Sequence, residues 1–129
     1  MSMEDRDKKL TFDYVKRNDG SSEFEEFLNS IPVKDKVKLL RTIQAVENNG
    51  LQIATRLEWV KKLDSNVYEV RSKLGNNIQR GLYFHKKDNK YIITHGFTKK
   101  TQKTPPREVK HAKNMRDRYL KEHKEGKNE

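Results

Sequence analysis

The stretch VYEVRSKLGNNIQRGLYFHKKDNKYIITHGF, residues 67–97, decides the fold because it contains three short runs rich in apolar side chains, the first of which alternates with polar ones. The three runs cover residues 67–71, 78–84 and 91–97. Polar segments separate them, with Asn76-Asn77 in the first and Lys87-Asp88-Asn89 in the second. A period of two is typical of β-strands, and short polar connections join strands in antiparallel order. The stretch therefore predicts an antiparallel meander of three strands.

The residues before this meander predict one strand and two helices. LTFDYVK, residues 10–16, alternates in the same way and predicts a first strand. Ser21 or Ser22 can cap a short helix that runs through SEFEEFLNSI, and Ile31-Pro32 begins a second helix that ends at Asn49-Gly50. The second helix carries an apolar stripe of Val33, Val37, Leu40, Ile43 and Val46.

After the meander, Pro105-Pro106 opens a final helix. Its apolar seam is thin and consists of Val109, Ala112, Met115 or Arg116, and Tyr119. The predicted order is β-α-α-β-β-β-α, an α+β fold with a small antiparallel sheet packed by two N-terminal helices plus a C-terminal helix. We expect the helices on one face of this sheet and the other face free.

The alternation also predicts which side chains leave the core. If Tyr68 and Val70 point into the core, Arg71 points outward. Arg80 shares its face with residues that are ordinarily core: Ile78, Leu82 and Phe84. Either a bulge re-aims Arg80 or that face is the functional one.

Length and composition exclude several classes of protein. The chain has 129 residues, which suits a single domain, with a core at about residues 10–120 and a polar tail at residues 121–129. Only 32% of it is hydrophobic and 37% is charged, and no stretch is apolar enough for a membrane span or a signal peptide. There is no cysteine, which excludes disulfides and thiolate sites and fits a reducing compartment, so we expect a cytoplasmic protein.

The formal net charge of +10 is unevenly distributed. Residues 1–50 carry a net −1, residues 51–98 a net +5 and residues 99–129 a net +6. A basic half indicates a polyanionic partner, most often nucleic acid. The alternative is a soluble basic protein with solvated lysines and no ligand.

The sequence offers little for metal or nucleophilic chemistry. The only imidazoles are those of His85, His95, His111 and His123, and no pair of them has a metal-ligand spacing with a carboxylate. We find no nucleophile elbow, P-loop or dinucleotide fingerprint, and we expect neither metal nor cofactor.

Basic groups gather instead near the end of the third run. HGFTKKTQKTP, residues 95–105, places three lysines and a histidine beside Phe97, and Arg71 and Arg80 lie on the two strands before it. Fixed cations stabilise a phosphoryl-transfer transition state, and aromatic side chains stack on unpaired bases. The alternative is an ordinary solvated loop with Phe97 in the core.

These segments resemble the phage-derived Gp49-like, or HigB-like, branch of the RelE/ParE toxin superfamily. The resemblance is carried by YEVR at residues 68–71, by Arg80 ahead of an aromatic strand and by HGFTKKTQKTP, and it spans roughly residues 10–120. It implies a RelE-like fold and the toxin of a type II toxin–antitoxin system. Such toxins cut mRNA in the ribosomal A site without a metal, by attack of the 2′-hydroxyl on the adjacent phosphate.

The resemblance also implies residue roles. Arg71 and Arg80 would stabilise the phosphorane, and Lys99 or Lys100 would neutralise charge or aid proton transfer. His95 is a candidate acid or base, whereas Glu69 is either a base or the ion-pair partner of Arg71. The implied RNA-binding residues are Lys73, Phe97 and Lys103, with Phe97 either stacking or packing.

The implied partners are the ribosome and its mRNA, and a cognate helix-turn-helix antitoxin whose acidic segment covers the basic groove. Two other functions stay open: inhibition of DNA gyrase, as in ParE-like members, and non-catalytic binding of nucleic acid. The nuclease hypothesis requires that the two arginines and the lysines converge on one concave site, free of neutralising carboxylates.

Overall fold

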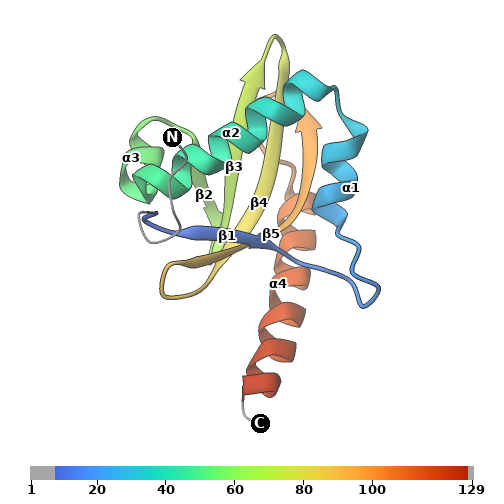
Figure 1. Cartoon of the computed structure of the whole chain (residues 1–129). Coiled ribbons are helices and arrows are strands. Elements are labelled where there is room, and N and C mark those ends of the chain that lie inside the picture. Colours follow the sequence, from blue (N-terminus) through green and yellow to red (C-terminus); the bar gives the residue numbers. More distant parts are fainter. Residues whose placement is uncertain (1–7, 128–129) are drawn as a thin grey trace.

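The computed structural model describes residues 8–127 and has an α+β architecture (Figure 1). In chain order its elements are β1 (Thr11–Tyr14), α1 (Glu23–Ser30), α2 (Val33–Asn49), α3 (Leu51–Arg56), β2 (Val60–Asp64), β3 (Val67–Leu74), β4 (Asn77–Lys87), β5 (Lys90–Lys99) and α4 (Pro106–Lys127). No helix in this described part is long and apolar enough to cross a bilayer.

The five strands form one sheet in the order β1-β5-β4-β3-β2. β3, β4 and β5 pair antiparallel, as predicted, and β2 joins them antiparallel to β3. β1 pairs with β5 in parallel, so the prediction of a purely antiparallel sheet was wrong. The strand alternation shows that residues 11–14 belong in a sheet, but it carries no information about the direction of their partner.

Two elements were missed, and the predicted order β-α-α-β-β-β-α is therefore incomplete. α3 follows α2 directly across Gly50, whose φ of 90° favours glycine. β2, with the sequence VKKLD, exposes three of its five residues, so its apolar alternation is too weak to mark a strand. It pairs with β3 through a turn in which Asn66 has a φ of 47°.

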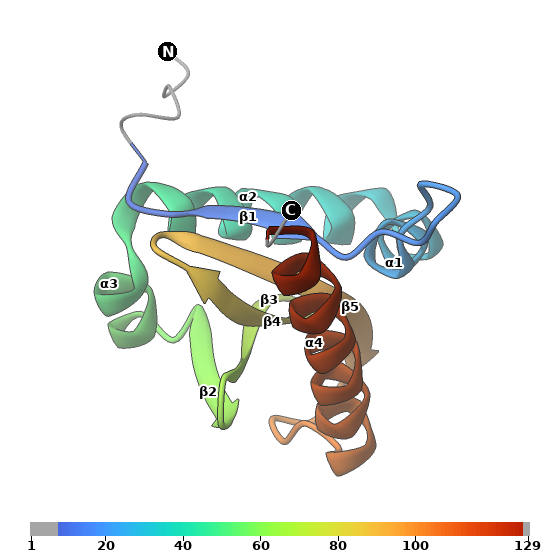
Figure 2. The ribbon, with the colours of Figure 1, turned by 90° about the horizontal axis from the view of Figure 1, so that it is seen from below.

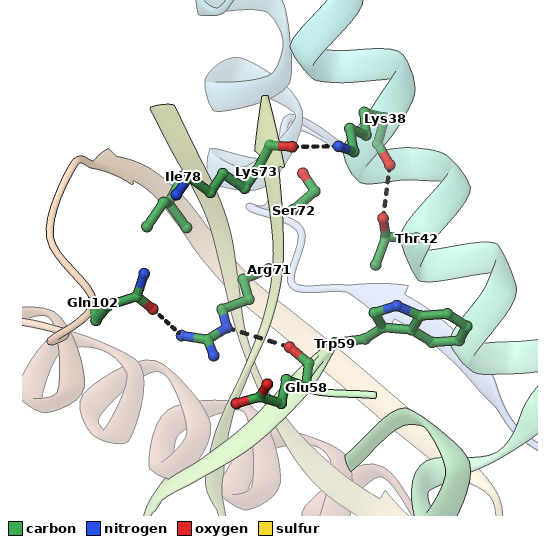
Figure 3. Close-up of a pocket in the computed structure, with 9 residues that line it drawn as sticks. All are labelled: Lys38, Thr42, Glu58, Trp59, Arg71, Ser72, Lys73, Ile78 and Gln102. Atoms are coloured by element: carbon green, nitrogen blue, oxygen red, sulfur yellow. Dashed lines mark hydrogen bonds between the residues drawn. The ribbon is translucent and has the colours of Figure 1, made fainter. Parts of the chain in front are cut away.

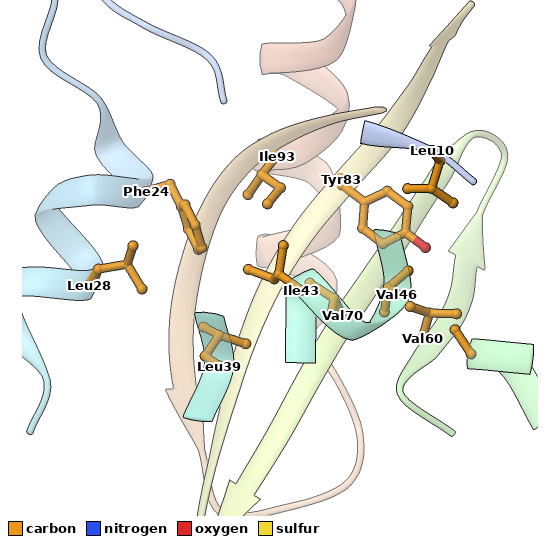
Figure 4. Packing of buried hydrophobic residues seen from close by; sticks show 11 residues of the cluster. Leu10, Phe24, Leu28, Leu39, Ile43, Val46, Val60, Val70, Tyr83 and Ile93 are labelled. Atoms are coloured by element: carbon orange, nitrogen blue, oxygen red, sulfur yellow. The ribbon is translucent and has the colours of Figure 1, made fainter. Parts of the chain in front are cut away.

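The main core lies between the sheet and the helices α1 and α2 (Figure 4). Ser22 caps α1 by accepting a hydrogen bond from the Glu25 amide, as predicted. The apolar stripe of α2 was only partly right: Ile43 and Val46 are buried, and Leu39 rather than Leu40 joins them. Val33, at 74% exposure, and Val37 and Leu40 face away from the core because the stripe turns away from the sheet toward the start of the helix.

The opposite face of the sheet is not free, which corrects the expectation of helices on one face only. α4 packs there, and Figure 2 shows α2 and α4 on opposite sides of the strands. Ala112 and Val109 of α4 contact Val67, Leu82 and Phe97 in a second apolar cluster. α4 continues as a helix through residues 121–127 of the predicted polar tail, whose last two residues lie outside the described part.

The outer edge of β3 is open beyond Arg71, whose amide donates to the Trp59 carbonyl oxygen, because β2 pairs only with the first half of that strand. At this open edge, the Lys38 ammonium of α2 donates a hydrogen bond to the Lys73 carbonyl oxygen. α2 is thereby tied to the end of β3.

We expect Gly96→Ala to lower the free energy of unfolding by about 1–3 kcal/mol, the usual range for overpacking. A Cβ at this position would overlap the Phe27 ring and approach the Arg80 carbonyl oxygen to 2.9 Å. The ring can move, but the backbone oxygen belongs to the neighbouring strand and cannot. Urea unfolding measures the effect, and Gly81→Ala, whose Cβ would lie 3.2 Å from the Phe24 ring, is the graded control with a smaller loss.

Candidate functional site

The pairing of β3, β4 and β5 places most of the predicted site residues in two neighbouring rows on one face of the sheet. One row joins Arg71, Arg80 and Phe97 as register partners. The next row joins Lys73 and Lys99 across Ile78. α4 covers the other end of this face, so both rows lie beside the loop of residues 100–105 that leads into α4.

Glu69 lies at the centre of these contacts and is fully buried. Its Oε1 atom lies 3.5 Å from Arg80 Nε, and its Oε2 atom lies 3.8 Å from Arg71 Nη1. The Thr104 hydroxyl donates a hydrogen bond to Oε1, which connects the loop to the sheet. Of the two roles open for Glu69, this geometry favours the ion pair.

Arg80 is also fully buried, although it was expected at an accessible site. Its Nη2 atom donates to the carbonyl oxygens of Thr101 and Gln102, at 2.6 and 2.8 Å. Burial lowers the pKa of Arg80 while the Glu69 carboxylate opposes that shift, and a guanidinium stays charged in either case. No bulge re-aims this side chain. The Arg80 side chain lies on the same face of the sheet as the two rows, and it binds the loop of residues 100–105 that covers it.

Arg71 reaches a pocket of about 530 Å³ at the open edge of β3 (Figure 3). Its side chain is 18% exposed. Nη1 donates to Gln102 Oε1 at 3.0 Å, and Nε donates to the Glu58 carbonyl oxygen at 3.3 Å. The pocket is lined by Lys38, Thr42, Glu58, Trp59, Arg71, Ser72, Lys73, Ile78 and Gln102.

Of the four predicted lysines, Lys73 lines the pocket, whereas Lys99, Lys100 and Lys103 lie at the end of β5 and in the loop that follows it. Lys73, Lys100 and Lys103 are exposed, and Lys99 is half-buried. Within the described residues, none of these four forms an ion pair. Two guanidinium groups and the ammonium groups of Lys38 and Lys73 outnumber the carboxylates of Glu58 and Glu69, so the site keeps a net positive charge. The two arginines thus meet at Glu69, but only Arg71 lines the pocket, and neither arginine lies free of a carboxylate.

His95 lies apart from the pocket, beneath α4, with an exposure of 3%. Its ring nitrogens lie 3.0 Å from Thr94 Oγ1 and 3.0 Å from Glu108 Oε1. The His111 ring packs edge-on against it, and Phe97 stacks on it and packs in the second apolar cluster. Of the two roles open for Phe97, packing is the one found in this structure.

We expect the free energy of unfolding to fall as the pH drops below about 6.5, the ordinary pKa of histidine. Burial lowers the pKa of His95 in the folded chain, although the Glu108 hydrogen bond partly opposes this shift. The unfolded chain therefore binds a proton at a higher pH than the folded one. The His95 contribution is complete above the unfolded pKa and is lost as the pH falls toward the folded pKa.

Urea unfolding at several pH values between 5 and about 7.5 measures this effect. His95→Gln should show a smaller loss over that window. If the stability of His95→Gln depended on pH as strongly as that of the wild type, His95 would not be the source of the pH dependence, and other groups would be responsible for it.

Among the charged, aromatic and amide side chains that line the pocket, four were missed in the sequence: Lys38, Glu58, Trp59 and Gln102. Lys38 and Gln102 lie in segments that looked like a solvated helix face and a solvated loop. Trp59 is the one tryptophan of the chain, and that was the only signal. The unusual φ of 62° at Glu58 is visible only in the structure.

Among the described residues, no group of three or more histidine, aspartate or glutamate side chains is placed to hold a metal ion. A family model described as phage derived protein Gp49-like (DUF891) matches residues 26–117. No curated protein matches the chain. The matched segment contains every residue of the two rows and the whole pocket.

Proposed function

Because the chain belongs to the phage-derived Gp49-like family, a RelE/HigB-like toxin branch, we propose that it is the toxin of a type II toxin–antitoxin pair and cleaves mRNA on the ribosome. The family supports a toxin-like module. The RNA target and the cleavage reaction are our inference from the site.

One observation carries the proposal: Arg71 lines an open pocket together with Lys38 and Lys73, and its guanidinium contacts Gln102 in the loop that carries Lys100 and Lys103. Lys73 lies on the same strand, and Lys99, Lys100 and Lys103 follow from the end of β5. We call the mouth of the pocket, together with the end of β5 and the loop of residues 100–105, the rim. A phosphate diester that lies across this rim meets several cations at once. Such cations stabilise the charge that develops in the transition state.

In the proposed reaction the ribose 2′-oxygen attacks the adjacent phosphorus atom, and the bond from phosphorus to the 5′-oxygen breaks. The products are a 2′,3′-cyclic phosphate and a 5′-hydroxyl end. The 2′-hydroxyl loses a proton and the leaving 5′-oxygen gains one. Arg71 stabilises the negative charge on the non-bridging oxygens, and Lys99 or Lys100 neutralises charge or assists proton transfer.

In this proposal Arg80 and His95 are buried and position other parts of the site without contacting the RNA. Arg80 holds the carbonyl oxygens of the loop, and His95 holds the start of α4 through Glu108. Lys73 and Lys103 bind phosphates on either side of the reacting bond. The partner is an antitoxin whose acidic segment neutralises this rim.

Induced expression in translating bacteria tests the proposal. Growth should stop, and primer extension should map new 5′ ends inside coding sequences, in ribosome-containing extracts but not on naked RNA. Intact transcripts together with a loss of DNA supercoiling would favour the gyrase alternative. Unaffected growth, with RNA binding that weakens steeply as salt increases, would leave only a nucleic-acid-binding domain.

A further inference from the structure

The pocket beside Arg71 combines groups that a phosphate site alone does not need. Its wall contains the indole of Trp59, which is half-buried, and the side chain of Glu58, which is exposed. Figure 3 shows the Glu58 side chain across Arg71 from Lys73, and the Trp59 indole to the side, near Thr42 of α2. The aromatic ring can stack on a base, the carboxylate can bind the edge of that base, and the guanidinium can bind a phosphate.

The carboxylate of Glu58 is free to bind a ligand. Among the described residues, no hydrogen bond or ion pair engages it, although Arg71 Nε donates to the carbonyl oxygen of the same residue. The backbone carbonyl of Glu58 therefore binds Arg71, whereas its side chain remains available for a ligand at the pocket wall.

The backbone at this position is fixed by the end of α3. Glu58 has a φ of 62°, which is uncommon for a residue with a Cβ. The Glu58 amide donates to Thr55 O at 3.0 Å, and the Trp59 amide donates to Ala54 O at 2.9 Å, so the end of α3 maintains it. These two bonds are those of a Schellman motif, so the positive φ of Glu58 belongs to the cap that ends α3 and fixes where the Glu58 side chain begins.

Gln102 closes the opposite side of the pocket. Its Oε1 atom accepts from Arg71, and a guanidinium can only donate, so the amide nitrogen of Gln102 must face away from Arg71. The pocket thus offers an acceptor-only carboxylate on one side and an amide donor on the other. Its volume of about 530 Å³ lies within the range of small-ligand sites, roughly 300–1,000 Å³.

We propose that this pocket binds a guanine nucleotide unit of RNA, with the base against Trp59 and the phosphate at Arg71. Guanine presents two adjacent donors, N1–H and the N2 amino group, to a carboxylate, which only accepts. Adenine and cytosine present one amino group on that edge, and uracil presents one N–H. This inference rests on the proposed function, to which it adds the base that the site prefers.

Fluorescence of Trp59 tests the proposal, because the chain has a single tryptophan. The full-length protein is titrated with each of the four nucleoside 3′-monophosphates and with inorganic phosphate. The guanosine compound should bind about tenfold more tightly than the other three and than phosphate, the discrimination expected of a bidentate contact. Equal affinity for all four, or phosphate binding as tightly as the guanosine compound, would overturn it.

Glu58→Gln should bring the four affinities to within about twofold of one another, since it removes the charged bidentate acceptor. Glu25→Gln is the matched control, because it removes the same charge from an exposed position on α1 and should keep the preference for guanosine. Retention of the preference in Glu58→Gln would refute the role of this carboxylate. Trp59→Phe lacks the fluorophore, so calorimetry follows it and should show weaker binding for every base.

The two proposals can fail separately. Selective binding of the guanosine compound without RNA cleavage would preserve the nucleotide site and reject the nuclease. Cleavage of mRNA by a protein that binds none of the four nucleotides selectively would preserve the nuclease and reject the guanine site.

Discussion

Glu69→Leu should destabilise the protein by about 3–5 kcal/mol, the cost of leaving a buried charge without its partner. Arg80 is fully buried, and among the described residues Glu69 is the only carboxylate within ion-pair distance of it. Two nitrogens of Arg80, Nε and Nη1, have no hydrogen-bond partner in this part of the chain. The loss is a large share of a typical free energy of unfolding of about 5–15 kcal/mol.

Urea unfolding followed by circular dichroism measures this effect. The double variant Glu69→Leu with Arg80→Met should recover much of the stability, because it removes both charges and fills the space with apolar atoms. Glu25→Leu, at an exposed position, is the control for the substitution itself. A wild-type unfolding midpoint for Glu69→Leu would show that Arg80 does not depend on this carboxylate.

Arg71→Ala should slow RNA cleavage by about 10²–10³-fold and abolish growth inhibition, since it removes a donor directed at the reacting phosphate. The side chain is partly exposed and only its contacts to Gln102, Glu58 and Glu69 are lost, so the fold should persist. Mapping of transcript ends after induction measures the activity, and thermal unfolding verifies the fold.

Arg71→Lys is the matched variant, because it keeps the charge and loses the two-pronged geometry, and we expect intermediate activity. Arg80→Ala is a poorer test of the chemistry, since it removes a buried support of the loop. Growth inhibition by Arg71→Ala at the level of the wild type would reject the role of this guanidinium.

Much of the fold could be predicted from local sequence patterns. Short runs rich in apolar side chains along β3, β4 and β5 identified the meander, and Pro105-Pro106 identified the start of α4. These signals are local, because a strand or a helix end depends on a few neighbouring residues. The parallel pairing of β1 and the packing of α4 on the far face depend on contacts distant in sequence, and no local pattern encodes them.

The candidate site shows the same division. The cross-strand neighbours Arg71 and Arg80 were predictable because strands joined by a short turn must pair. Whether a guanidinium faces solvent or supports a loop depends on what covers it, and the loop carbonyl oxygens over Arg80 have no sequence signature. Glu58 was missed for a related reason: its exposed side chain matters only because α3 and β2 place it beside Arg71.

The hydrogen bond from Lys38 to the Lys73 carbonyl oxygen bears on how the molecule behaves at high concentration. An unpaired strand end attracts strands from other molecules, and a cation stationed on such an edge discourages that association. Lys38 therefore hinders the pairing of a strand from another molecule with the second half of β3. The rim can thus remain accessible to a flexible polyanion while strand pairing between copies of the protein is disfavoured.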